Sequence, residues 1–239
     1  DVGGLQKAIA PIGQKDDVFV GDYVGGGFSI SDWTYERGIV EDGADVRLGL
    51  FGEMQGSISH LKLRGVWSMG WSNCSQAGFL VGRVSGSTSS VFDIDADFDE
   101  GSIMQPNTGG TSYTKCGMLI GETEGISTGV RLSGTITFEG RATTLGGVVG
   151  ETFNGASISW IRNDAVFNKT HTGLGRGNQV NTGTVVGGIV GSIGPGTESA
   201  FHVFNAMVGN IHGEFCGGIA GRCSGSGMTR SDTWVNCMQ

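Results

Sequence analysis

The chain has 239 residues, including 46 glycines and only 3 prolines, and 38 % of it is hydrophobic, which is enough to bury a core. Charged residues make up 16 % and leave a formal net charge of −8. So few cations are a poor basis for binding nucleic acid or an anionic membrane surface. No apolar run reaches the roughly 18 residues of a membrane helix, so we expect no nucleic-acid ligand and no membrane insertion.

Residues 1–47 precede the first copy of the repeat described below. We predict that they cap the array or form its first coil. They contain Pro11-Ile12-Gly13, then Phe19 to Tyr23, then the run from Gly25 to Asp32. The chain begins at Asp1 without an initiator Met and shows no secretory leader, so we expect a processed product or part of a larger chain.

Residues 48–239 are predicted to form one elongated repeat domain, because a short glycine-ended motif returns six times. Its copies are LGLFG (48–52), AGFLVG (77–82), CGMLIG (116–121), LGGVVG (145–150), VGGIVG (186–191) and CGGIAG (216–221). The closing glycines are Gly52, Gly82, Gly121, Gly150, Gly191 and Gly221, separated by 30, 39, 29, 41 and 30 residues. A period in this range indicates stacked units, because one unit cannot cover its own apolar face.

Equivalent positions of the six copies share one chemical character, as stacking requires. The residue after each closing glycine is polar: Glu53, Arg83, Glu122, Glu151, Ser192 and Arg222. The position after that is mostly apolar, so the columns alternate as a pleated strand does. Further strand-like stretches follow the glycines at 58–63, 90–98, 130–132, 135–138 and 201–208. We predict an all-β parallel β-helix (β-solenoid) of about six or seven coils with little or no helix; a β-propeller is the main alternative.

The six copies resemble the GLUG-motif repeat, named for its glycine–leucine–hydrophobic–glycine core. The resemblance starts with the segments around Pro11 and Phe19 and covers residues 11 to about 237. It implies a β-solenoid module of large surface or extracellular proteins, including bacterial adhesins and secreted peptidases, in which the module is an accessory part. It implies no set of catalytic residues. The uneven spacing of the copies and the five cysteines depart from the bacterial pattern.

Four aspartates at every second position, followed by Glu100, form the one cluster with metal-binding chemistry. They are Asp93, Asp95, Asp97 and Asp99. Carboxylate oxygens bind Ca²⁺, but an EF-hand loop would need Gly and Glu where Phe98 and Met104 stand. With a period of two, the four side chains would share one strand face. A solvated outer face and a Ca²⁺ site both stay open, and no other cofactor is expected.

An apolar residue stands immediately before each closing glycine, and this column is a possible surface for a partner. It contains Phe51, Val81, Ile120, Val149 and Val190, with Ala220 in the last copy. Strict alternation would turn this column outward if the Leu50 column points inward, which would make a regular apolar stripe. Either the strand bends at the glycine and takes both columns inside, or another segment or subunit covers the stripe.

The cysteine and asparagine residues have structural interpretations. Cys116 and Cys216 occupy a column that otherwise holds aliphatic residues, so mostly free, buried thiols are expected. Asn163, Asn205 and Asn236 follow their glycines by 13, 14 and 15 residues and are predicted to stack. Asn73 and Asn168 begin glycosylation sequons, which are relevant only on a secretory route.

These observations favour a protein without catalytic activity. Our first hypothesis is a structural or adhesive module of a cell-surface or extracellular protein, an adhesin for example, that contacts a protein or glycan partner within a larger chain or assembly. The alternative is a virion component, such as a minor capsid, cement or fibre protein. A polysaccharide-active β-helix enzyme is the third hypothesis, which lacks the paired carboxylates of glycoside hydrolysis.

Overall fold

The protein is a parallel β-solenoid, seen in a computed structural model that describes residues 10–14, 16–35, 46–71, 74–106, 114–139, 142–170, 185–195, 197 and 215–223. Within these residues there are strands and no helix. One sheet has 14 strands and a second has six, and the named strands pair in parallel in both. The predicted fold class is therefore confirmed.

Each coil, meaning one turn of the solenoid, contains a short strand, a glycine corner and a longer strand or pair of strands. The strands before the first glycine motif are β1 (Phe19–Val24), β2 (Ser29–Ser31) and β3 (Thr34–Tyr35). The strands of the first two coils are β4 (Arg47–Leu48), β5 (Phe51–Gly65), β6 (Ser68–Trp71), β7 (Gln76–Ala77), β8 (Val81–Val84) and β9 (Ser90–Pro106).

The strands of the next two coils are β10 (Lys115–Gly117), β11 (Ile120–Thr123), β12 (Ile126–Glu139), β13 (Thr144–Gly146), β14 (Val149–Thr152), β15 (Ser157–Asn163) and β16 (Val166–Thr170). The last two glycine motifs are described only at their corners, as β17 (Val185–Gly187), β18 (Val190–Ile193), β19 (Phe215–Gly217) and β20 (Ala220–Cys223). The described residues therefore make about four complete coils, fewer than the six or seven predicted. Six glycine corners nevertheless stack in one series.

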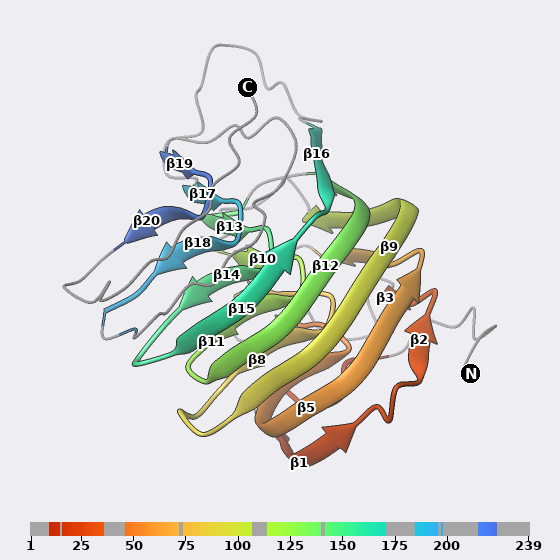
Figure 1. Ribbon diagram of the computed structural model, residues 1–239, viewed down its shortest axis with the longest axis vertical. Helices are drawn as coiled ribbons and strands as arrows, with labels where there is room; N and C mark the ends of the chain where they lie inside the picture. Colours follow the sequence, from red (N-terminus) through yellow and green to blue (C-terminus); the bar gives the residue numbers. More distant parts are fainter. Residues whose placement is uncertain are drawn as a thin grey trace.

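The long strands β5, β9, β12 and β15 lie side by side across the front of the molecule (Figure 1). The shorter strands continue the same sheet in the order β5, β8, β11, β14, β18 and β20. The six-stranded sheet, in the order β4, β7, β10, β13, β17 and β19, forms the other arm of each corner. At the N-terminal end β1 and β2 pair with β5, and β3 pairs with β6, so this segment lies in register with the first coil.

The closing glycines are needed because each corner lies closely against the corner of the preceding coil. A Cβ atom on Gly121 would lie 2.5 Å from the carbonyl oxygen of Gly82 and 2.6 Å from the amide nitrogen of Ala77. A Cβ on Gly82 would likewise lie 2.7 Å from the carbonyl oxygen of Gly52. Real Cβ atoms essentially never lie so close to backbone atoms, so a side chain at these positions would force successive coils apart.

The apolar column before the closing glycines is core and not a surface for a partner. Phe51, Val81, Ile120, Val149 and Val190 are at most 1 % exposed. They join the column that contains Leu50 and Leu80 in a single hydrophobic cluster, because the chain turns a corner there and the alternation of a flat strand does not apply. The first of the two predicted alternatives, in which both columns point inward, is the one observed.

Aromatic side chains fill the interior of the first coils. The ring of Trp67 lies 5.4 Å from that of Trp33, 5.9 Å from that of Phe79 and 5.6 Å from that of Phe98, measured between centroids. Trp67 is fully buried, and its indole nitrogen donates a hydrogen bond to the carbonyl oxygen of Arg64. The packed interior holds the outer face of the long strands as a rigid surface.

Candidate functional site

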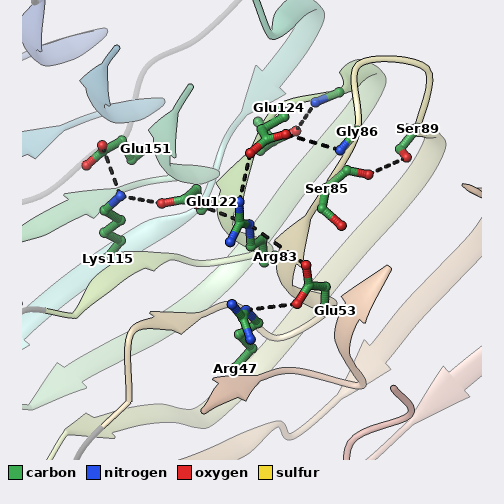
Figure 2. Close-up of polar contacts among 12 residues, drawn as sticks. Arg47, Glu53, Arg83, Ser85, Gly86, Ser89, Lys115, Glu122, Glu124 and Glu151 are labelled. Atoms are coloured by element: carbon green, nitrogen blue, oxygen red, sulfur yellow. Dashed lines mark hydrogen bonds and ion pairs between the residues drawn. The ribbon is translucent and has the colours of Figure 1, made fainter. Parts of the chain in front are cut away.

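A network of alternating charges runs across the glycine corners from the first to the fourth coil. We call it the charge ladder; its members are Arg47, Glu53, Arg83, Lys115, Glu122, Glu124 and Glu151. Figure 2 shows Arg83 in the middle, between Glu53 and Glu122. Each contact joins a residue of one arm or coil to the next, so the network ties four successive coils together.

The distances in the charge ladder are those of direct ion pairs. Nε of Arg47 lies 3.0 Å from Oε2 of Glu53. Arg83 contacts Glu122 at 3.3 Å and Glu124 at 2.7 Å, and approaches Glu53 to 4.0 Å. The side chains of Glu53 and Glu122 are only 8 % and 5 % exposed. Because a buried carboxylate without a cation destabilises the folded protein, the fold depends on these ion pairs.

Lys115 offsets the repulsion between two glutamates that the stacking places side by side. Glu122 and Glu151 are direct partners in neighbouring parallel strands, where two like charges repel. Nζ of Lys115 comes from the opposite arm, contacts Glu122 and lies 3.1 Å from Glu151. One cation therefore serves both carboxylates. Farther along the stack, Ser192 and Arg222 continue the column of Glu151.

The two cations at the centre of the charge ladder have raised pKa values. Burial alone would lower the pKa of Arg83, but the hydrogen bond to Glu124 and the charges of Glu122 and Glu53 outweigh it. Burial would lower the pKa of Lys115 in the same way, and its contacts with Glu122 and Glu151 raise it overall. Both side chains are therefore held in their charged form.

A second polar feature lies on the outside of the solenoid, where the long strands bend. We call it the outer corner; its residues are His60, Asp93, Gly129 and Trp160. Their φ angles are +53°, +53°, +63° and +55°. The strand register places them beside one another in successive coils, because their neighbours on either side are direct partners. The side chains of His60 and Asp93 contact each other and are 50 % and 67 % exposed.

Beyond this corner, a row of charged residues crosses the outer face, but cations and anions do not alternate along it as they do in the charge ladder. Lys62, Asp95, Arg131 and Arg162 are partners in one row across four coils. Asp95 is engaged by Arg64, and Arg162 is engaged by Asp164. Arg131 is exposed and forms no ion pair with any residue that the structure describes.

The four aspartates predicted as a Ca²⁺ site do not converge. The predicted alternation holds, since Ile94, Ala96 and Phe98 are buried between the aspartates, but Asp93 lies at the outer corner in a left-handed conformation and contacts His60. Asp95 contacts Arg64, and Asp97 accepts a hydrogen bond of 2.8 Å from Ser133. Among the described residues, no group of three or more Asp, Glu, His or Cys side chains is placed to hold a metal ion. Ca²⁺ binding stays a prediction.

The described cysteines are mostly buried, and Asn163 connects its coil to the next one. Cys74 and Cys116 are buried, Cys223 is exposed, and Cys116 is a free thiol. Burial, with a smaller effect of Cys74, raises the pKa of Cys116 well above its ordinary value. The amide nitrogen of Asn163 donates a 2.8 Å hydrogen bond to the carbonyl oxygen of Gly188 in the next coil.

Asn163 is the first member of the predicted asparagine stack. Its other two members, Asn205 and Asn236, lie outside the described residues. Of the two sequons, that of Asn168 falls in β16, and Asn73 lies outside the described residues.

The charge ladder and Trp160 were not predicted from the sequence. The polar column after the glycines was visible, and its alternating signs in Glu53, Arg83 and Glu122 were a usable signal. The contribution of the opposite arm, through Arg47 and Lys115, depends on how the corner folds. Trp160 gave no signal, because a tryptophan in a strand-like segment is ordinarily core.

Comparison with known proteins found no match among family models, curated proteins or solved structures. Within the described segments, no helix has the length and hydrophobicity needed to cross a bilayer.

Proposed function

We propose that this chain is a non-catalytic structural or adhesive β-solenoid module of a cell-surface or extracellular protein, which contacts a protein or glycan partner. The observation that carries the proposal is the in-register stack. Each coil repeats the same corner, and ion pairs connect the corners of successive coils. Such a stack is a stiff scaffold that presents one long, regular outer face. The resemblance to GLUG-motif repeats supports the same proposal.

The construction of the outer face also supports a role in contact. Its charged side chains are held by partners in neighbouring coils, as for Arg64 with Asp95 and for Ser133 with Asp97. Side chains fixed in this way lose little conformational entropy on binding. A surface that is already ordered can therefore bind a repetitive partner, such as a polysaccharide or an array of identical proteins.

Binding to surfaces tests this proposal. Fluorescently labelled chain is applied to cultured cells and to an array of glycans and extracellular proteins. Saturable binding to at least one cell type or array component, competed by unlabelled chain, is the expected result. An absence of saturable binding to every cell and array component contradicts the adhesive role.

A virion component is the second candidate function, and the buried free thiol of Cys116 favours it. Cys116 lies in the core as a reduced cysteine, as expected of a chain that folds in a reducing compartment. In this case the rod cements an assembly. Native mass spectrometry of the assembly isolated from its source decides between the two candidates. A large, closed, homogeneous particle favours the virion, and a membrane- or wall-attached chain favours the surface module.

A further inference from the structure

The N-terminal end of the stack is an open strand edge. β1 pairs with β5 on one side, and no described strand pairs with its other side. Figure 1 shows β1 as the last strand of the front sheet at this end. A Cβ atom on Gly21, in the middle of β1, would have no atom within 4 Å and would face open space. A strand paired on one side presents every second backbone N–H and C=O group to its unpaired side.

The core is incompletely covered at the same end. Phe19 and Tyr23 are only partly buried, although both pack against the hydrophobic cluster. Their direct partners in β5, Met54 and Ile58, are each 0 % exposed. The two pairs of side chains occupy the same columns, but β5 has a strand on both sides and β1 has a described strand on one side only. One more strand beyond β1 would complete the burial of both aromatic rings.

Apolar side chains also gather on the outside of this end. Val20 and Val24 are 73 % and 62 % exposed, and Phe28, in the turn after β1, is 74 % exposed. The partners of the two valines in β5 are the polar residues Gln55 and Ser59, so the outer face changes from polar to apolar at its last strand. β1 contains no lysine, arginine or proline, the residues that commonly protect an edge strand from pairing. An apolar, unprotected edge is typical of a contact surface.

The charge of this end indicates which kind of strand fits it. Residues 10–35 contain four aspartates and one lysine, a net charge of −3. Asp22 lies in β1 itself, exposed, and its Oδ1 accepts a 2.5 Å hydrogen bond from the hydroxyl of Ser57 in β5. A strand added beyond β1 places one side chain directly beside Asp22, and a cation at that position is favourable. The same end of a second copy would bring like charges together, which disfavours a two-fold contact.

We propose that the open edge of β1 binds an extended segment of a partner protein, both apolar and basic, as an additional strand. Apolar side chains of the segment cover Phe19 and Tyr23 on the inside and Val20 and Val24 on the outside. A lysine or arginine between them pairs with Asp22. Backbone hydrogen bonds supply affinity, and the alternating side chains supply specificity. This inference rests on the contact function proposed above and specifies the chemistry of a protein partner.

Fluorescence anisotropy with two labelled peptides tests the edge. The probe is the peptide TIVKVIT with an amidated C-terminus, whose central lysine can lie beside Asp22 in either strand direction; the matched peptide TIVEVIT has glutamate there. We expect saturable binding of the lysine peptide, about fivefold or more tighter than that of the glutamate peptide. The bound lysine peptide should also slow amide hydrogen exchange in residues 19–24 about tenfold or more. Equal binding of both peptides, or no saturable binding of the lysine peptide, overturns the proposal.

Two substitutions locate the site. Val24→Lys places a cation on the exposed edge without touching the core, so the urea midpoint should stay that of the wild type. Affinity for the lysine peptide should nevertheless fall about tenfold or more. Asp22→Asn keeps an oxygen for the hydrogen bond from Ser57 but removes the charge, so it should abolish the preference for the lysine peptide.

Matched controls lie away from the edge. Val166→Lys replaces an apolar side chain that is 40 % exposed in β16, and Asp97→Asn removes an exposed carboxylate from β9. Both controls should bind the two peptides as the wild type does. If Val24→Lys and Asp22→Asn also bind both peptides unchanged, the edge of β1 is not the site.

Two further measurements separate this inference from its neighbours. Saturable binding to cells without binding of the lysine peptide overturns this inference alone and leaves the adhesive function standing. In sedimentation velocity the wild type should remain a single species over a wide range of concentrations. Concentration-dependent association that Val24→Lys abolishes would make a second copy the occupant of the edge, and would overturn the proposal of a basic partner segment.

Discussion

At the scale of single residues, Arg83 is the side chain on which the charge ladder depends most. Replacing it by methionine keeps much of the apolar stem but leaves the buried carboxylates of Glu53 and Glu122 with fewer cations. We expect Arg83→Met to lower the free energy of unfolding by about 2–4 kcal/mol, measured by urea denaturation. Arg131→Met is the matched control, because Arg131 is exposed and outside the ladder, and it should change stability by less than about 0.5 kcal/mol. Equal effects of the two substitutions would contradict the role of the ladder.

Gly121 tests how closely one corner lies against the corner of the preceding coil. A methyl group there meets the backbone of Gly82 and Ala77 at 2.5 and 2.6 Å, and neither neighbour can move without shifting a coil. We expect Gly121→Ala to cost about 3 kcal/mol or more, or to prevent folding. Gly70→Ala is the control, since its new Cβ would have the carbonyl oxygen of Gln105 at 3.7 Å, an ordinary contact. If Gly121→Ala is tolerated as well as Gly70→Ala, the close contact of Gly121 with the backbone of Gly82 and Ala77 is contradicted.

Residue types alone predicted some of these sites and not others. The closing glycines and the polar column were visible because they recur at equivalent positions. The outward direction of the four aspartates was also visible, since Ile94, Ala96 and Phe98 between them are buried, but their separate contacts with residues of other coils were not. The partnership of Lys115 with two glutamates needs the folded corner, since Lys115 and Glu151 are 36 residues apart in the sequence.

At the scale of strands, β10 supplies the cation that allows β11 and β14 to lie in register. The pKa of Lys115 is raised above its ordinary value of 10.5, so its ionic contribution to stability is fully present below that pH. The contribution is lost as the pH rises through the higher pKa of the folded state. We expect the stability difference between the wild type and Lys115→Met to be constant from pH 8 to about 10.5 and to shrink above it.

Urea unfolding at a series of pH values up to 11.5 measures that difference. Lys62→Met is the control, because Lys62 is exposed on the outer face and belongs to no described ion pair. Its stability difference from the wild type should stay near zero throughout. If the difference for Lys115→Met does not shrink above pH 10.5, the charge of Lys115 is not what stabilises the pairing of β11 and β14.

Strand positions were predicted well and the turns between them less so. The segments predicted at 58–63 and 90–98 lie within β5 and β9, and those at 130–132 and 135–138 lie within β12. The segment at 201–208 lies outside the described residues. Alternation identified these strands because one face of each is core. Alternation alone left open whether the apolar column containing Phe51 points inward or outward, because a corner places successive residues inside where a flat strand would not.

At the scale of the whole molecule, successive coils lie directly over one another. The repeat of the glycine motifs was sufficient to predict this stacking, because equivalent residues of different copies match in chemistry. It did not predict the number of complete coils, since the copies mark corners and the described residues complete about four coils. The outer face of the long strands is formed by this stacking.

Pulsed electron paramagnetic resonance between two spin labels tests the stacking most directly. Asp22, Ser57, Ser90, Ile126 and Ser157 are successive partners in one row of parallel strands. Asp22 and Ser157 are 135 residues apart in the sequence but only four strand spacings apart, about 19 Å. Labels are attached to Asp22→Cys and Ser157→Cys in a background whose natural cysteines are replaced. A narrow distribution within a label length of about 19 Å is predicted, and a mean beyond about 35 Å would contradict the solenoid.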